Sequence, residues 1–294
     1  MNFVFAHIDD VRILEAAARV HRAPCGSGEI ILREWRPADV AAQAQPPVVL
    51  LHGGSGSWRH WLRNIPALMR ERRVIAVDMP GYGDSASPPE PVDFPALGRI
   101  IATAVDPLIG DAGYHIAGFS LGSFVAPNVA AASARRLRSL ILIHGHFWGV
   151  MRYTPRGTLK RWRNVEDRNE RRDILRYNLG QLMLAHPESA DDLTLDVYAA
   201  DLEKARLRVE TFIGTLDTTL LNRLDAPILA VSGALDPTGM PDVAVQQERL
   251  RAARETAGGA PVECVVLENV GHWAMWEAPQ AIDALLTDWL QRRS

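Results

Sequence analysis

Seven short apolar segments alternate with helix-like stretches, and this alternation constrains the fold more than any other feature of the chain. Continuous apolar runs are typical of strands covered on both faces, and strands that alternate with helices are typical of a parallel sheet. The expected strands are 28–35, 46–54, 72–81, 112–120, 136–145, 225–236 and 261–272. The expected helices are 59–71, 94–109, 121–134, 241–256 and 279–291, with one more at 8–19. We therefore predict an α/β fold with a doubly wound, mostly parallel sheet.

One interval lacks this alternation. From Gly149 to Leu224 the chain is polar with helical spacing and has no strong strand pattern. An interval of this length is too long for a simple connection between strands. We predict that 149–224 forms a helical lid inserted into an α/β core made of 1–148 and 225–294.

Composition excludes several classes of protein. The 294 residues are 47% hydrophobic and 23% charged with a net charge of −3, which is ordinary for a globular chain and gives nucleic acid no basic surface. Two cysteines cannot build a disulfide framework or a cysteine zinc cluster. No apolar run reaches the roughly 18 residues of a membrane helix, and the first residues do not resemble a signal peptide. We expect a cytoplasmic protein that binds a small molecule without a cofactor or nucleic acid; its oligomeric state is not indicated.

The strongest motif is Gly118-Phe119-Ser120-Leu121-Gly122, at the end of a predicted strand and the start of a predicted helix. In this position G-x-S-x-G forms a sharp turn that projects the serine above the sheet. A small-residue packing turn would explain the pentapeptide equally well if it stood alone. The residues that follow favour a nucleophilic serine.

A serine nucleophile needs a base, and the base needs an orienting acid. Asp236 and His272 each follow an apolar run, so both belong at the strand ends where ligands bind in open α/β sheets. We assign His272 as the base and Asp236 as the acid. The other carboxylates of this part of the chain fit less well: Asp225 precedes its strand, Asp242 lies on the following helix, and Glu268 and Glu277 are only close to His272 in sequence.

Acyl transfer also needs hydrogen-bond donors for the oxyanion. One predicted donor is the backbone N–H of Leu121, directly after the serine. The second lies in the glycine-rich loop 52–58, where we choose the N–H of Gly54 and, as second choice, that of Ser55.

Taken together, these motifs resemble the α/β-hydrolase superfamily, in its lidded group of esterases, C–C bond hydrolases, epoxide hydrolases and haloalkane dehalogenases. The matching segments are 52–54, 78–85, the turn at Ser120, 232–236 and 271–272, in the family's order. The resemblance implies the fold and the triad, but not the substrate, because this superfamily changes its chemistry through lid and loops.

Two positions narrow the chemistry that the resemblance implies. Relatives that open epoxides or displace halide use aspartate as nucleophile, whereas this chain has Ser120. Relatives that cleave vinylogous diketones usually carry asparagine before the nucleophile, and here Phe119 stands there. We expect a serine hydrolase that cleaves an ester-like acyl bond through an acyl-enzyme. The alternatives are a C–C bond hydrolase or lyase with the same triad, and a ligand-binding member with slow turnover.

Aromatic residues and imidazoles adjoin each predicted site loop, and we expect them to shape the pocket. These candidates, besides Ser55, are Trp58, Phe119, His144, His146, Phe147, Trp148 and Trp273. The pair His144 and His146 lacks a third ligand, so no metal site is predicted. The segment 152–176 carries nine basic and four acidic residues. Such a run is usually a solvated helix face, and the alternative is an entrance that attracts anionic substrates.

Overall fold

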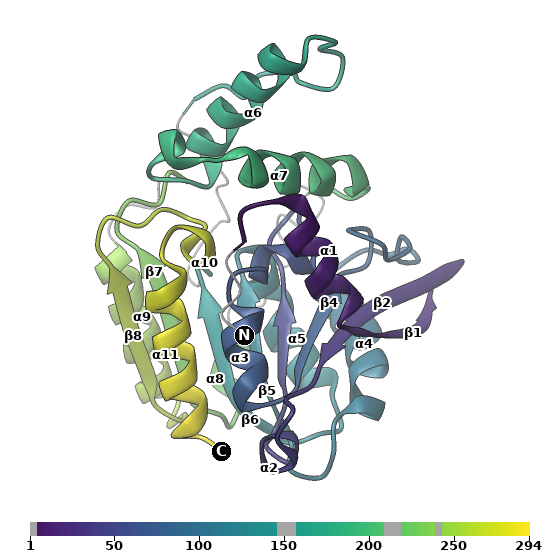
Figure 1. Ribbon diagram of the computed structural model, residues 1–294. Helices are drawn as coiled ribbons and strands as arrows, with labels where there is room; N and C mark the ends of the chain where they lie inside the picture. Colours follow the sequence, from purple (N-terminus) through teal and green to yellow (C-terminus); the bar gives the residue numbers. More distant parts are fainter. Residues whose placement is uncertain (1–4, 146–156, 209–218, 239–242) are drawn as a thin grey trace.

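The core of the molecule is an eight-stranded sheet with helices on both faces (Figure 1). The computed structural model describes residues 5–145, 157–208, 219–238 and 243–294. The strand order is β1-β2-β4-β3-β5-β6-β7-β8. Strand β2 is antiparallel to both of its neighbours, β1 and β4, and all other neighbouring strands are parallel. The strands are β1 (Arg19–Cys25), β2 (Gly28–Trp35), β3 (Val48–Leu51), β4 (Val74–Asp78), β5 (Tyr114–Phe119), β6 (Leu137–Ile143), β7 (Ile228–Gly233) and β8 (Val262–Leu267). The predicted doubly wound, mostly parallel sheet is confirmed.

Each of the seven predicted strands is present, and the sequence prediction missed β1. This strand forms a hairpin with β2 at the edge of the sheet, and its burial alternates between exposed and half-buried positions up to the buried Cys25. A polar edge strand lacks the continuous apolar run by which the inner strands are recognised. The predicted helix at 8–19 therefore ends earlier, at Ala16.

The main helices coincide with the predicted ones, and shorter helical turns connect them. The long helices are α1 (Ile8–Ala16), α3 (Ile65–Glu71), α4 (Phe94–Val105), α5 (Leu121–Ala132), α6 (Arg168–Leu182), α7 (Asp192–Lys204), α9 (Val243–Thr256) and α11 (Pro279–Gln291). The short ones are α2 (Val40–Gln43), η1 (Trp58–Trp61), η2 (Asp106–Leu108), η3 (Pro187–Ser189), α8 (Leu220–Arg223) and α10 (Ala274–Glu277).

Two apolar clusters, one on each face of the sheet, bury the strands. Trp35, Trp61 and Trp289 belong to one cluster, and Phe94 and Tyr114 belong to the other. All residues of β3, β4 and β5 are buried. Burial on both faces explains why these strands are apolar without alternation.

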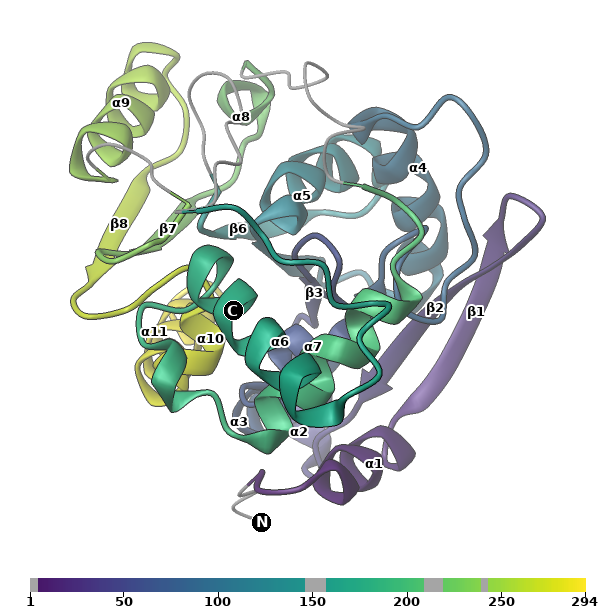
Figure 2. The same cartoon turned by 90° about the horizontal axis from the view of Figure 1, so that it is seen from above.

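Helices α6 and α7 follow β6 in the chain and lie above the sheet, where Figures 1 and 2 show them crossing over the strands. They belong to the segment for which we predict an inserted lid, and α8, near its end, packs instead against α5 and α9. The predicted start of the lid, Gly149, and the part 209–218 lie outside the described residues, whereas its predicted end, Leu224, directly follows α8.

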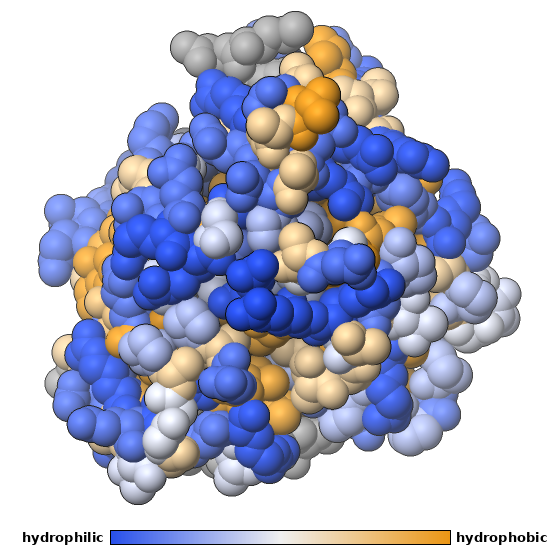
Figure 3. All heavy atoms as spheres, turned by 90° about the horizontal axis from the view of Figure 1, so that it is seen from below, coloured by the Kyte–Doolittle hydropathy of each residue, from blue (hydrophilic) through white to orange (hydrophobic). Residues whose placement is uncertain are grey.

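The opposite face of the molecule, seen from below, is largely hydrophilic with small hydrophobic areas between the polar residues (Figure 3). In the described residues, no helix is both long and apolar enough to cross a membrane.

Candidate active site

The turn between β5 and α5 has the geometry that the G-x-S-x-G motif predicts. Ser120 has φ of 50° and ψ of −114°, a strained conformation for a residue other than glycine. A Cβ atom at Gly118 would lie 2.3 Å from the carbonyl oxygen of Gly122, and one at Gly122 would lie 2.6 Å from that of Leu51. Only glycine fits these two positions, so the sequence itself forces the sharp turn that exposes Ser120.

Ser120, His272 and Asp236 form a continuous chain of hydrogen bonds. The Oγ atom of Ser120 lies 2.9 Å from Nε2 of His272, and Nδ1 of His272 lies 2.7 Å from Oδ2 of Asp236. Asp236 follows β7, and His272 lies in the loop after β8. The structure therefore brings together the three residues that the sequence assigns to the triad. A hydroxyl beside a neutral imidazole that is held by a carboxylate can lose its proton as it attacks an acyl carbon.

Asp236 is a nearly buried carboxylate with many donors. Its Oδ2 atom also lies 2.9 Å from Nδ1 of His144, and its Oδ1 atom accepts hydrogen bonds from the N–H and Oγ–H of Thr238, at 2.8 and 2.6 Å. Burial alone would raise the pKa of Asp236, but His272 and the hydrogen bonds from His144 and His272 hold that pKa far below its ordinary value. The carboxylate is therefore ionised at every working pH.

One of the alternative acids has other contacts, and another is exposed. Glu277 accepts hydrogen bonds from the N–H groups of Gly271, Ala185 and His186, so it joins the loop before His272 to the segment after α6. Glu268 is exposed. Asp242, the remaining alternative near Asp236, lies outside the described residues.

The loop after β3 is held by two buried histidines. His52 accepts a hydrogen bond at Nε2 from Met79 N–H and therefore donates Nδ1–H to the Gly53 carbonyl, at 2.7 Å. His60 accepts at Nδ1 from Gly53 N–H, at 3.1 Å. Burial lowers the pKa of both imidazoles, and that of His60 falls well below its ordinary value. Both rings are thus neutral, and their hydrogen bonds hold the loop against the end of β4 and against η1.

The predicted oxyanion donors border the same cavity as Ser120. Gly54, Ser55 and Leu121 line it, and within the described residues no acceptor lies against the N–H of Gly54 or of Leu121. Leu121 is the first residue of α5, so its N–H belongs to the free donors at a helix N-terminus. Two unused N–H groups beside a serine hydroxyl are suited to bind a developing oxyanion.

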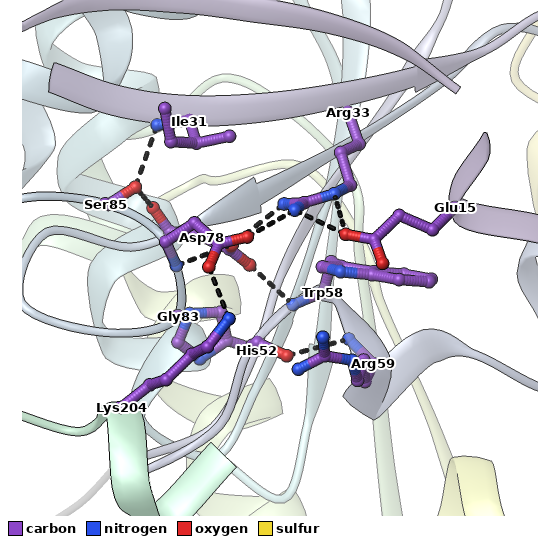
Figure 4. Close-up of polar contacts among 12 residues, drawn as sticks. Glu15, Ile31, Arg33, His52, Trp58, Arg59, Asp78, Gly83, Ser85 and Lys204 are labelled. Atoms are coloured by element: carbon purple, nitrogen blue, oxygen red, sulfur yellow. Dashed lines mark hydrogen bonds and ion pairs between the residues drawn. The ribbon is translucent and has the colours of Figure 1, made fainter. Parts of the chain in front are cut away.

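A charged network beneath this loop connects it to α7 (Figure 4). Asp78, at the end of β4, accepts from Trp58 N–H at 2.8 Å and from Arg33 at 2.9 Å. Arg33 also binds Asp84, which in turn binds Lys204 of α7. Burial would raise the pKa of Asp84, but the cations Lys204 and Arg33 lower it to about 2. The loop, the end of β4 and α7 are therefore positioned by one set of ion pairs.

A cavity of about 700 Å³ opens above Ser120 between the sheet and the segment 157–208. This volume is in the range of small-molecule sites. Its wall is mainly apolar, from Phe119, Leu121, Phe124, Leu159, Trp162, Leu182, Met183, Tyr198, Leu202 and Leu207. Its charged lining consists of four exposed cations, Lys160, Arg163, Arg206 and Arg208, and no carboxylate among the described residues lines it. The cavity is thus apolar with a cationic part.

Of the predicted pocket residues, Ser55 and Phe119 line the cavity. The prediction is wrong for Trp58, His144 and Trp273, which are at most 2% exposed and lie behind the cavity wall. Trp58 packs on Trp35, Trp273 packs on Trp276, and His144 contacts Asp236. Side chains next to a site loop in sequence point into the core here. His146, Phe147 and Trp148 fall outside the described residues.

Sequence reasoning missed several residues of the cavity. His60 and Thr238 gave no signal, because their roles depend on the folded positions of η1 and of the loop after β7. Asn178 of α6 binds both the N–H and the carbonyl of Lys160, each at 2.9 Å, and so fixes the backbone of that lysine at the cavity. Arg206 and Arg208 lie beyond the basic run that the sequence singled out.

The basic run divides into two parts. Arg171 and Arg172 pair with acidic residues of α7, and Arg176 pairs with Asp173, which agrees with a solvated helix surface. Lys160 and Arg163 line the cavity instead. Arg152 and Arg156 lie outside the described residues.

Ligand atoms of His144, Asp236 and His272 lie within 4.8 Å of one another, a spacing that a metal ion could bridge. Both ring nitrogens of His144 are already engaged, because Gly233 N–H donates to Nε2 at 3.1 Å and Nδ1 faces Asp236. A neutral imidazole with an acceptor at Nε2 carries its proton on Nδ1 and cannot offer that atom to a metal. The donor set fits a hydrogen-bonded cluster and does not fit a metal site.

Comparison with curated proteins gives, among others, a dienedioate hydrolase and an acetyltransferase component as relatives. The chain is 28% identical over 277 residues to a 2-hydroxy-6-oxononadienedioate/2-hydroxy-6-oxononatrienedioate hydrolase of Cupriavidus pinatubonensis, covering 86% of this chain and 89% of that protein. A stretch of 105 residues is 41% identical to the dihydrolipoyllysine-residue acetyltransferase component of the acetoin cleaving system of Pseudomonas putida, covering 36% of this chain. That match spans only 28% of the acetyltransferase component.

Solved structures share the fold. An esterase from a Rhodococcus species superposes with a TM-score of 0.69 at 21% identity, covering 94% of this chain and 99% of that one. The carboxylesterase CesB of Bacillus subtilis gives 0.67 at 20% identity, covering 93% and 91%. The model of the alpha/beta hydrolase family matches residues 48–285, which include all three triad positions. The chain therefore belongs to the alpha/beta hydrolase family.

Proposed function

We propose that this protein is a serine hydrolase that cleaves an ester-like acyl bond of a small molecule. The observation that carries the proposal is the hydrogen-bonded chain Ser120–His272–Asp236, with Ser120 exposed to the cavity beside two free N–H groups. Membership of the alpha/beta hydrolase family supports hydrolysis, and the esterase neighbours are compatible with it.

In the proposed mechanism His272 accepts the proton of Ser120 at Nε2 while Oγ attacks the acyl carbon. The N–H groups of Gly54 and Leu121 bind the oxygen that becomes negative. His272 then gives its proton to the leaving group, and a water molecule, deprotonated by the same imidazole, releases the acid from Ser120. Asp236 holds the Nδ1–H tautomer of His272 throughout and stabilises the imidazolium.

The cavity favours an amphipathic substrate. Its apolar wall suits a hydrocarbon or aromatic group, and its four cations, without a carboxylate among the described lining residues, suit an anionic group on the same molecule. We therefore propose a substrate in which a carboxylate or phosphate is separated by an apolar part from the bond that is cleaved.

C–C bond hydrolysis is the second candidate, and the dienedioate hydrolases among the relatives favour it. The same triad can serve both reactions. Phe119 favours the ester reaction, because this residue borders the cavity at the position where the C–C hydrolases that the chain resembles usually carry asparagine.

Steady-state hydrolysis separates these candidates. We expect turnover of nitrophenyl esters, more efficient with a distal carboxylate on the acyl chain than with the uncharged ester of equal length, and loss of turnover in Ser120→Ala. Faster cleavage of a vinylogous 1,5-diketone bearing a carboxylate than of any ester would favour the C–C reaction. Binding of these compounds without turnover of either class would contradict the enzymatic proposal and favour a ligand-binding member.

A further inference from the structure

His144 directly follows β6, contacts Asp236 of the triad and is not among the residues that line the cavity. Its side chain is 1% exposed, and its ring lies 4.9 Å from that of His272 between centroids. Its backbone has φ of 51°, in the left-handed region that residues other than glycine rarely adopt. The resemblance and the triad give this residue no task, so its contacts need their own explanation.

The two histidines that face Asp236 differ at their second ring nitrogen. Nε2 of His272 faces the hydroxyl of Ser120, which can donate or accept, so this imidazole can take up a proton. Nε2 of His144 faces the N–H of Gly233 at 3.1 Å. A proton on that nitrogen would point at the amide hydrogen, so Gly233 restricts His144 to the neutral form with its proton on Nδ1.

In that form His144 donates Nδ1–H to Oδ2 of Asp236, the same oxygen that receives Nδ1–H of His272. We propose that His144 is a positioning residue of the triad. It is a permanent hydrogen-bond donor that orients Asp236 and, like His272, binds the negative charge on Oδ2 of Asp236. The inference rests on the proposed serine hydrolase. The catalytic unit then consists of Ser120, His272, Asp236 and His144. The imidazole of His272 can move a proton, whereas that of His144 cannot.

The second donor on Oδ2 of Asp236 changes how strongly that carboxylate holds a proton on His272. Within the described residues, the titratable groups around this ring are Asp236, His144 and His60, and burial lowers the pKa of both of these histidines. Asp236 is then the charged neighbour that holds the imidazolium. A second donor on Oδ2 weakens this hold, so loss of that donor should make His272 keep its proton to higher pH.

A matched pair of variants isolates the donor. His144→Asn keeps an N–H near the position of Nδ1 and tolerates the left-handed backbone, whereas His144→Phe keeps the ring and loses the N–H. We expect kcat of His144→Phe to fall about ten- to a hundredfold with little change in KM, because a hydrogen bond to a charged group is lost. We expect the acid limb of its pH–rate profile to move to higher pH, and His144→Asn to restore both toward wild type.

His115→Phe is the control, since it removes another buried imidazole, one that contacts Ser139 and has its pKa lowered to about 3 by burial. It should leave the acid limb unchanged. Equal losses in the Asn and Phe variants, or a Phe variant with the wild-type profile, would overturn the inference.

Imidazole nitrogen and proton NMR of the wild type and His144→Phe tests the inference without turnover. We expect His144 to stay neutral with its proton on Nδ1 from pH 5 to 9, and the downfield Nδ1 proton of His272 to shift in the variant. A proton on Nε2 of His144, titration in that range, or an unmoved His272 proton would overturn the inference. Absence of ester turnover in the wild type contradicts the proposed function instead, and NMR still decides the role of His144.

Discussion

Two buried carboxylates, Asp236 at the edge of the sheet and Asp201 on α7, have opposite surroundings. Asp236 accepts hydrogen bonds at both oxygens, from two imidazoles and from Thr238, and its pKa is lowered. Asp201 accepts at Oδ1 from Ser57 at 2.7 Å and from Arg59 at 3.0 Å, while its buried Oδ2 has no partner among the described residues.

Burial therefore raises the pKa of Asp201 to about 6, although Arg59 and Ser57 oppose the shift. Burial alone therefore does not decide whether a carboxylate is charged; the cationic neighbours and hydrogen-bond donors around it do. At the sheet edge the donors secure a permanent anion for the triad. Around Asp201 they are fewer, and we expect the contact between α7 and the loop after β3 to depend on pH.

The largest effect should come from Asp236, whose two oxygens both accept hydrogen bonds. We predict that Asp236→Asn folds but loses on the order of 10⁴ in kcat, because the imidazole of His272 is then held in the wrong tautomer. Turnover of a nitrophenyl ester measures this loss. Near-full activity in Asp236→Asn, together with an inactive Glu268→Gln, would show that Asp236 is not the acid of the triad and that its many donors have another role.

The second effect concerns Asp201, whose pKa in the folded protein exceeds its unfolded value of about 3.8. The folded state then binds a proton more tightly, so stability rises as pH falls through 6 and levels off below about 4. Relative to Asp201→Asn, the wild type should gain up to about 3 kcal/mol in free energy of unfolding between pH 8 and pH 4.

Denaturant unfolding at several pH values measures this difference. Asp173→Asn is the control, because Asp173 is an exposed partner of Arg176 and should give a flat difference. A flat or reversed difference for Asp201→Asn would mean that Asp201, like Asp236, has enough donors to stay ionised in the folded protein.

The smallest effect concerns the cationic part of the cavity. We predict that Arg163→Gln lowers kcat/KM for an ester with a distal carboxylate roughly three- to tenfold, since an exposed charge contributes little. The uncharged ester should be unaffected, and so should Arg176→Gln, which removes an arginine paired with Asp173 outside the cavity. Equal losses on both esters would mean that Arg163 acts through its bond to the Leu202 carbonyl.

The sequence predicted the central sheet and the three triad positions because both depend on local rules. Buried parallel strands require apolar runs, and the turn at Ser120 requires glycine at 118 and 122. Asp236 and His272 come directly after apolar runs, so their place at the sheet edge follows from the chain order.

The remaining parts depend on packing that no local pattern reports. Trp58 and Trp273 adjoin site loops but point into the core, and the cavity takes Arg206 from a segment far from the basic run. The role of His144 depends on the N–H of Gly233, a backbone group on another strand. Such contacts become visible only when the strands are placed side by side.

Covalent labelling of Ser120 tests the central proposal most directly. A fluorophosphonate should label a single residue, identified as Ser120 by mass spectrometry of the digested protein, because the exposed hydroxyl lies between His272 and the free N–H groups of Gly54 and Leu121. Ser120→Ala should abolish the label. Labelling that persists in Ser120→Ala, or an active wild type that stays unlabelled, would contradict the serine mechanism.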